Sequence, residues 1–182
     1  EVQNYREAIR KRGLRIPLQY IVVNVKFYIL KLVFNENFLI PRPETELVVE
    51  KIINESDKST NLKILDVGVG SGNISLSISK NLPNSKVVSI DISENALAVA
   101  KQNAKLNELQ ERVEFKLYDI MNGDLNGLGK FDVIVSNPPY VSENNYDNLE
   151  PELKNHEPKI ALTDNSDGIS FYKHIIENSD QI

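Results

Sequence analysis

The chain has 182 residues, of which 41% are hydrophobic and 26% charged, as in an ordinary globular protein with one sizeable core. Its formal net charge of -5 argues against a surface built to neutralise nucleic-acid phosphates, so we expect no direct nucleic-acid partner. The absence of cysteine excludes disulfides, thiolate metal sites and a cysteine nucleophile, and with only two histidines we expect no metal. No run approaches the roughly 18 apolar residues of a membrane span, so we expect no membrane contact.

The first third of the chain predicts a helix, a hairpin and a second helix. Residues 1–15 are typical of a helix end that Gly13 closes. Residues 18–35 combine β-branched and aromatic residues with partial alternation, which predicts a β-hairpin. The residues expected on one face of that hairpin are Val23, Val25, Phe27 and Ile29. Residues 40–56 predict a helix with Pro43 near its first turn.

The rest of the chain alternates apolar runs with helix-length segments. The predicted strands are residues 63–69, 86–92, 113–119 and 130–137. The predicted helices are residues 73–82, 93–107 and 168–178. Strands separated in this way favour right-handed βαβ units, so the fold class is α/β with a mostly parallel, Rossmann-like sheet. In such a sheet the fourth strand lies next to the first.

A glycine loop follows the first of these strands. In "DVGVGSG" (66–72) the glycines at 68, 70 and 72 let the backbone approach a ligand, one residue short of the dinucleotide pattern. Asp66, Asp91 and Asp119 each fall at the carboxyl end of a strand, where ligands of open α/β sheets bind. Carboxylates suit S-adenosylmethionine, whose sulfonium and ammonium groups are cationic. Taken alone, the loop has an alternative interpretation as a glycine-rich turn beside a surface aspartate.

The fourth strand ends in "SNPPY" (136–140), and two prolines in succession end any central strand. The Asn137 carboxamide and the Pro138 carbonyl offer two acceptors to an NH₂ group, and Tyr140 can stack on a planar amide or base. The turn therefore favours a planar, NH₂-bearing substrate. The alternative is a rigid surface turn whose tyrosine packs locally.

Six motifs resemble the HemK/PrmC family of protein-(glutamine-N5) methyltransferases. They are "PLQYI" (17–21), "IPRPETE" (40–46), "DVGVGSG" (66–72), "NPPY" (137–140), "EPKIAL" (157–162) and "DGISFY" (167–172). NPPY is shared with DNA enzymes that methylate amino groups, whereas IPRPETE is the more specific signal. The resemblance implies a class I S-adenosylmethionine-dependent fold and methylation of the glutamine in the Gly-Gly-Gln motif of peptide chain release factors. It also implies a cytoplasmic location.

The resemblance implies three groups of functional residues in this chain. It implies that S-adenosylmethionine is bound by the first loop and three later strand ends, at Asp66, Gly68, Val69, Gly70, Ser71, Gly72, Asp91, Asp119, Ile120 and Asn137. It implies that the substrate glutamine is held by Asn137, Pro138, Pro139 and Tyr140. It implies that the cofactor side is closed by Arg42, Pro43, Glu44 and Thr45. For this last segment, a proline-started helix with an exposed arginine is the alternative.

The resemblance also divides the chain into three parts. Residues 1–16 are expected to be a remnant of an N-terminal helical domain, residues 17–40 a β-hairpin linker, and residues 41–182 a catalytic domain without its last strands. The family usually carries glycines in the hairpin where this chain has residues 22–32. Two rival functions stay open: a DNA or RNA adenine amino-methyltransferase, and a cofactor-binding fragment without activity. The first predicts a basic face or a target-recognition insertion.

Overall fold

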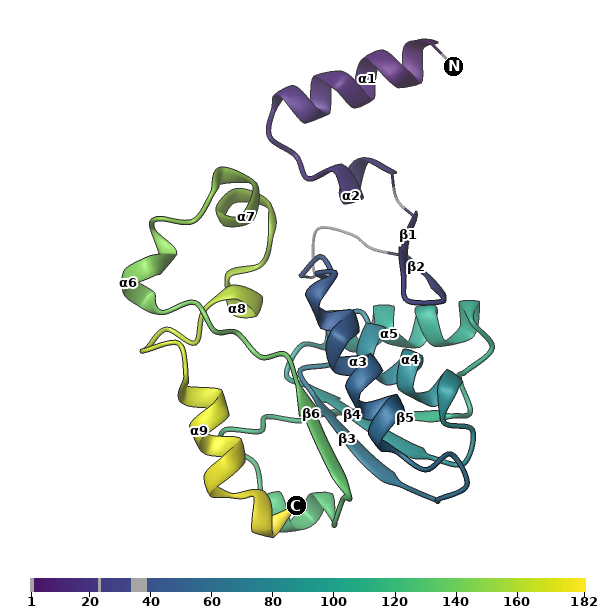
Figure 1. The fold of residues 1–182 in the computed structure, drawn as a ribbon. Coiled ribbons are helices and arrows are strands. Elements are labelled where there is room, and N and C mark those ends of the chain that lie inside the picture. Colours follow the sequence, from purple (N-terminus) through teal and green to yellow (C-terminus); the bar gives the residue numbers. More distant parts are fainter. Residues whose placement is uncertain (1, 23, 34–38) are drawn as a thin grey trace.

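The protein was analysed as a computed structural model, which describes residues 2–22, 24–33 and 39–182 (Figure 1). The strands are β1 (Asn24–Phe27), β2 (Leu30–Val33), β3 (Lys63–Val67), β4 (Lys86–Asp91), β5 (Val113–Leu117) and β6 (Val133–Ser136). The helices of the first half are α1 (Val2–Gly13), α2 (Leu18–Val22), α3 (Glu44–Glu55), α4 (Asn73–Asn81) and α5 (Glu94–Leu106). Those of the second half are η1 (Leu125–Leu128), α6 (Glu143–Tyr146), α7 (Pro151–His156), α8 (Lys159–Leu162), α9 (Ser170–Glu177) and η2 (Ser179–Gln181).

The four predicted strands form one parallel sheet in the order β5-β4-β3-β6. The fourth strand pairs with the first, because Val67 at the end of β3 lies opposite Ser136 at the end of β6. Asp91 at the end of β4 lies opposite Leu117 at the end of β5. The prediction of a mostly parallel sheet is confirmed, and all four carboxyl ends meet at one edge.

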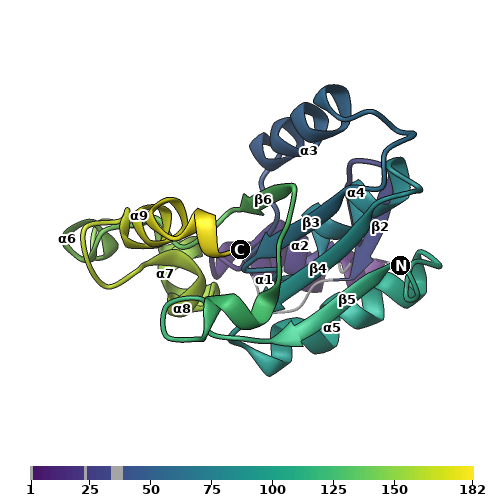
Figure 2. The same ribbon diagram turned by 90° about the horizontal axis from the view of Figure 1, so that it is seen from below.

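Helices lie on both faces of the sheet (Figure 2), and a hydrophobic core fills the space on each face. On one face α3, α4, α5 and the hairpin enclose a cluster that includes Val49, Ile64 and Leu76. On the other face α9 and η1 cover Leu65, Ile90 and Leu125, with Ile175 of α9 against them. The helix α5 begins as predicted, because the Ser93 side chain accepts a hydrogen bond from the Ala96 amide. Its predicted apolar stripe is buried: Ala96, Leu97, Ala100 and Ala104.

The hairpin is confirmed, but it is shorter than predicted. Residues 18–22 form the helix α2 instead of a strand. The turn comes early, since Tyr28 has a positive φ of 51° and Ile29 is 58% exposed while Leu30 is buried. The expectation that Ile29 shares a face with Phe27 is therefore wrong. Val23 and residues 34–38 lie outside the described residues, as does the side chain of Val25.

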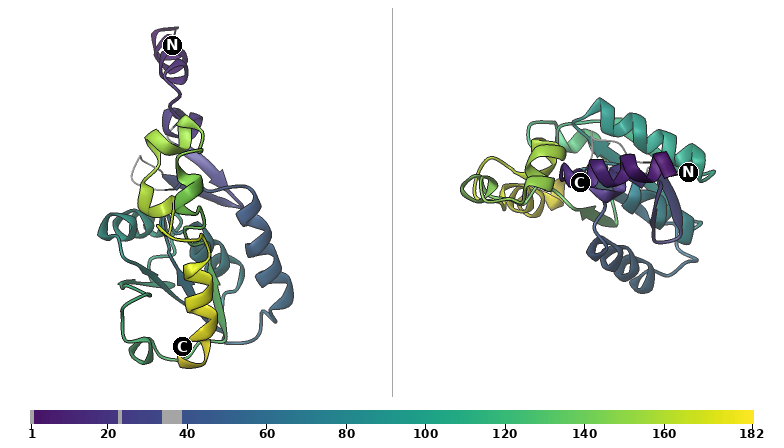
Figure 3. Two further views of the ribbon diagram at one scale, coloured as in Figure 1. Left: turned by 90° about the vertical axis from the view of Figure 1, so that its left-hand side faces the viewer. Right: turned by 90° about the horizontal axis from the view of Figure 1, so that it is seen from above.

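The helix α1 projects away from the sheet and its core (Figure 3). It has no buried residue, and Val2, Tyr5 and Ile9 are exposed. In the described part of the chain, no helix is long and apolar enough to cross a membrane.

Candidate active site

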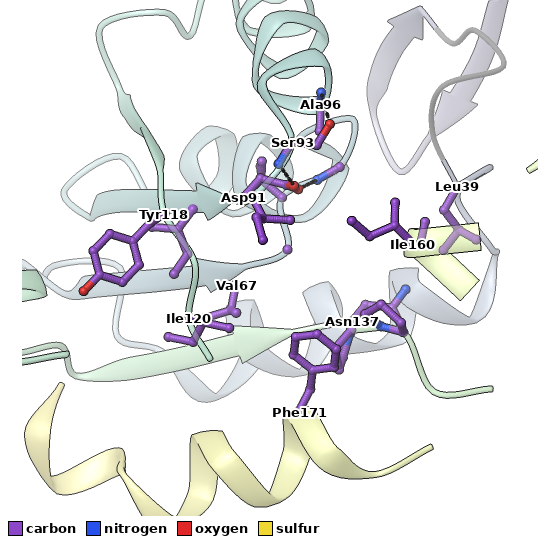
Figure 4. Close-up of a pocket in the computed structure, with 18 of the residues that line it drawn as sticks. Leu39, Val67, Asp91, Ser93, Ala96, Tyr118, Ile120, Asn137, Ile160 and Phe171 are labelled. Atoms are coloured by element: carbon purple, nitrogen blue, oxygen red, sulfur yellow. Dashed lines mark hydrogen bonds between the residues drawn. The ribbon is translucent and has the colours of Figure 1, made fainter. Parts of the chain in front are cut away.

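A cavity of about 320 Å³ opens at the carboxyl ends of the parallel strands (Figure 4). This volume is within the usual range for small-molecule sites. Ten of the residues predicted for the site line it: Gly68, Val69, Gly70, Ser71, Asp91, Asp119, Ile120, Asn137, Pro138 and Pro139. Val67, the last residue of β3, was not predicted and also lines the cavity. The ends of all four parallel strands and the loops after them thus contribute to one cavity.

The glycine loop is held by the neighbouring strand. The amides of Gly68 and Val69 both donate to the Ile90 carbonyl, at 2.9 and 3.1 Å. Gly68 and Gly70 have φ values of 79° and 53°, and a Cβ built on either would meet nothing within 4 Å. The loop therefore leaves open space beside its backbone, which a ligand can fill.

Gly72 has a different neighbourhood from the other two glycines. It does not line the cavity, and its φ is 83°. A Cβ at this position would lie 3.1 Å from Leu76 Cδ1 and 3.3 Å from Ala100 Cβ. Gly72 thus allows close packing of the loop on α4 and α5.

Asp91 is fixed by backbone donors on both of its carboxylate oxygens. Oδ2 accepts from the Gly70 amide at 3.0 Å and Oδ1 from the Ser93 amide at 2.9 Å. Burial raises the pKa of Asp91, while these backbone hydrogen bonds lower it in part. Each oxygen keeps a further lone pair that can accept from a ligand hydroxyl.

The other two predicted carboxylates differ from Asp91. Asp66 is fully buried beneath the loop, does not line the cavity, and accepts from the Ser75 amide at 3.2 Å. Burial raises the pKa of Asp66 to about 7, and its Oδ1 has no hydrogen-bond partner in the described structure. Asp119 lines the cavity, and hydrogen bonds from Asn122 and Met121 lower its pKa.

The turn after β6 brings a free carboxamide to the cavity. The Ser136 hydroxyl donates to the Val67 carbonyl at 2.8 Å, which ties the turn to β3. Asn137 lines the cavity, and among the described residues its side chain makes no hydrogen bond. Tyr140 is 54% exposed and does not line the cavity.

Sequence reasoning did not identify the remaining walls. They are formed by Leu39, Pro41, Asn73, Ile74, Ile90, Ile92, Ser93, Ala96, Tyr118, Met121, Asn122, Pro158, Ile160, Ala161 and Phe171. In Figure 4, Leu39 and Ile160 lie toward the Asn137 side of the cavity, and Tyr118 lies at the opposite end. Ile160 and Phe171 lie in two motifs quoted for the resemblance, and that was the signal available for them.

The four residues of the IPRPETE motif predicted for the site do not line the cavity: Arg42, Pro43, Glu44 and Thr45. Pro43 precedes α3 and Thr45 is buried. Arg42 is turned toward Glu157, with its Nη2 at 2.7 Å from Oε1 and 2.9 Å from Oε2. Among the described residues there is no group of three or more His, Cys, Asp or Glu side chains that could hold a metal ion.

Comparisons with known proteins agree with this geometry. The methyltransferase domain family matches residues 58–174, which is more than half of the chain. The release factor glutamine methyltransferase of Fusobacterium nucleatum is 45% identical over 163 residues, covering 88% of this chain and 45% of the relative. That of Flavobacterium psychrophilum is 46% identical over 166 residues, covering 88% and 57%. The chain thus spans about half the length of these relatives.

A solved structure shares the fold. The hMettl16 catalytic domain superposes with a TM-score of 0.64 at 19% identity, covering 90% of this chain and 61% of that one. The predicted class I methyltransferase fold is thereby confirmed. The chain belongs to the methyltransferase domain family, and its predicted kinship with the release factor glutamine methyltransferases is confirmed.

Proposed function

We propose that this chain is the catalytic part of an enzyme that transfers a methyl group from S-adenosylmethionine to the glutamine side chain of a Gly-Gly-Gln motif in a release factor. One observation carries the proposal: the Asn137 side chain, which makes no hydrogen bond to any residue that the structure describes, lines the same cavity as the glycine loop and Asp91. The proposed cofactor site and the proposed amide site thus share one cavity. The sequence relatives are release factor glutamine methyltransferases, which supports the same reaction.

The residues fit the cofactor. The open space beside Gly68 and Gly70 leaves room for it against the loop backbone. Asp91 would accept hydrogen bonds from the two ribose hydroxyls, and Asp119 with Ile120 would lie near the adenine. S-adenosylmethionine supplies an electrophilic methyl group on a sulfonium sulfur.

Asn137 and Pro138 orient the glutamine amide. An amide nitrogen is a poor nucleophile because its lone pair is delocalised into the carbonyl. Hydrogen bonds from its NH₂ group to the Asn137 Oδ1 and the Pro138 carbonyl would hold that lone pair toward the methyl carbon. Orientation of this kind can lower a barrier by roughly 7–11 kcal/mol.

The bond changes balance without a further reactant. A bond forms between the amide nitrogen and the methyl carbon, the carbon–sulfur bond breaks, and its electron pair stays on sulfur. The nitrogen then loses one proton to water. The Asn137 acceptor stabilises the positive charge that develops on that nitrogen during the attack.

We propose that the chain divides as its sequence suggests, into an N-terminal helical segment (1–16), a hairpin linker (17–40) and the catalytic part (41–182). The projection of α1 away from the cores and the separate two-stranded hairpin support this division. The proposed partner is the release factor, and the proposed location is the cytoplasm.

Labelled S-adenosylmethionine tests the proposal directly. Incubation of the protein with a release factor should place one methyl group on the glutamine of Gly-Gly-Gln, located by mass spectrometry of the peptide. A release factor with asparagine at that position should take up none, because the shorter side chain cannot reach the methyl carbon. Labelling of adenine in duplex DNA or RNA would favour the nucleic-acid function. Binding of the cofactor without transfer to any of them would identify an inactive fragment.

A further inference from the structure

One wall of the cavity is built from two segments that lie outside the sheet. Leu39 and Pro41 precede α3, and Pro158, Ile160 and Ala161 surround the start of α8. The two segments are more than a hundred residues apart in the chain. Because no strand of the sheet holds either of them, other contacts must fix this wall.

An ion pair joins the two segments beside the wall. The Arg42 Nη2 lies 2.7 and 2.9 Å from the two carboxylate oxygens of Glu157. The Glu157 side chain is 0% exposed and that of Arg42 is 29% exposed. Burial raises the pKa of Glu157, whereas Arg42 and the Ile40 backbone lower it. A buried carboxylate with one cationic partner depends strongly on that partner.

A second set of contacts joins α8 to the substrate turn. The Val141 amide donates to the Leu162 carbonyl at 2.9 Å, and Val141 also forms a parallel bridge with Thr163. Val141 directly follows the NPPY turn. A continuous path of contacts therefore runs from Arg42 through Glu157 and α8 to the residues that hold the amide.

We infer that Arg42 and Glu157 form a positioning pair, which holds the α8 wall and the Asn137 turn at the spacing that methyl transfer requires. Neither residue lines the cavity, so they act through the wall and not by touching substrate or cofactor. This inference rests on the proposed function, and it assigns the specific IPRPETE arginine to the amide end of the cleft. The cofactor end is held separately, by backbone hydrogen bonds to Ile90 and Asp91.

Three variants and one matched control test the pair. Arg42→Gln removes the cation, Glu157→Gln removes the anion, and Arg42→Lys keeps the charge if the first variant fails to fold. The control is Glu152→Gln, because Glu152 also pairs with arginines, Arg12 and Arg15, and belongs to α7 but does not line the cavity.

Three measurements are made on each variant: the single-turnover rate with a release factor at saturating cofactor, cofactor affinity by calorimetry, and hydrogen exchange of the Val141 and Thr163 amides. Arg42→Gln should slow turnover by roughly tenfold to a hundredfold, the effect of a small misplacement of reacting groups. Its cofactor affinity should stay within about threefold, a change too small to indicate loss of a direct charged contact. Both amides should exchange faster, and the Glu152→Gln control should match the wild type in all three measurements.

Two results would overturn the inference. Unchanged exchange at Val141 and Thr163 in a folded Arg42→Gln or Glu157→Gln variant would show that the pair does not hold the wall. A loss of melting temperature with normal turnover per folded molecule would show a purely structural role. If the wild type itself transfers no methyl group, the proposed function fails, and the exchange measurement still decides whether the ion pair holds the wall.

Discussion

At the glycine-loop end of the cavity backbone amides fix the Asp91 carboxylate, whereas at the other end the Asn137 carboxamide has no hydrogen-bond partner among the described residues. Asp91 accepts two backbone hydrogen bonds, and the loop amides of Gly68 and Val69 donate to Ile90. The Asn137 side chain makes no hydrogen bond among the described residues, and the wall beside it comes from the segment before α3 and from the short helix α8. Groups fixed in advance, as at Asp91, suit a cofactor that binds in one pose. An acceptor without a partner, as at Asn137, suits a contact to the substrate amide that strengthens during the reaction.

The largest effect on the rate of methyl transfer is expected at Asn137. Asn137→Ala should slow single-turnover methyl transfer by at least about a hundredfold, a loss typical of removing one well-placed polar group. Melting temperature and cofactor affinity should change little, since the side chain holds nothing else in the described structure. Asn137→Asp keeps an acceptor and should retain more activity than alanine. A folded alanine variant with near-normal turnover would remove Asn137 from the mechanism.

A smaller effect, on the affinity for S-adenosylmethionine, is expected at Asp91. Asp91→Ala should weaken S-adenosylmethionine binding by roughly 1.5–3 kcal/mol, the range for hydrogen bonds to a charged group. The alanine also leaves the amides of Gly70 and Ser93 without their acceptor. Calorimetry measures the change, with circular dichroism as the check on folding. Unchanged affinity in a folded variant would place the cofactor elsewhere.

Two glycines of the loop allow a matched comparison. Alanine at either Gly68 or Gly72 should cost about 1–2 kcal/mol of stability, because both have positive φ. Gly72→Ala should lose more stability, since its methyl group meets Leu76 and Ala100. Gly68→Ala should lose more cofactor affinity, since its methyl group enters the open space of the site. Thermal melts with and without S-adenosylmethionine compare the two, and the reverse order would contradict the assigned roles.

A pH-dependent effect on stability concerns the buried Asp66, whose pKa is raised to about 7 by burial. The folded protein then holds a proton that the unfolded chain releases near pH 4, so this group favours folding at low pH. Its contribution falls by at most about 1.4 kcal/mol per pH unit as the pH rises from about 4 to about 7, and then stays constant. Asp66→Asn lacks this contribution, so the difference between the wild-type and variant stability curves should show this slope between about pH 4 and pH 7. Parallel curves for both proteins would show that Asp66 does not titrate in this range.

Local patterns predicted the elements that depend on local chemistry. The four strands, their parallel order, the glycine loop and the Ser93 cap follow from apolar runs, glycine spacing and a capping residue. The expectation that Ile29 continues the alternation of Phe27 was wrong, because the chain turns at Tyr28, which takes a positive φ that tyrosine rarely adopts. The helix α2 was missed, because its residues have β-branched and aromatic neighbours.

Contacts between distant residues set the part of the site that the sequence did not predict. Whether Arg42 faces the cavity depends on Glu157, which lies 115 residues away. The short helices α6, α7 and α8 carry no strong periodic signal, and the Val141–Leu162 hydrogen bond helps to set where α8 lies. Asp66 was expected in the cleft because it ends a strand, but its side chain is buried under the loop.

The central claim is that the Asp91 end of the cavity binds the cofactor and the Asn137 end orients the amide. It is tested most directly by combining Asp91→Ala with Asn137→Ala. Single-turnover rates are measured for the wild type, both single variants and the double variant, at a cofactor concentration below saturation. If one end binds the cofactor and the other orients the amide, the two losses should multiply, with the summed free energies agreeing within about 0.5 kcal/mol. A double variant no slower than the worse single variant would contradict the account, because both residues would then serve the same step.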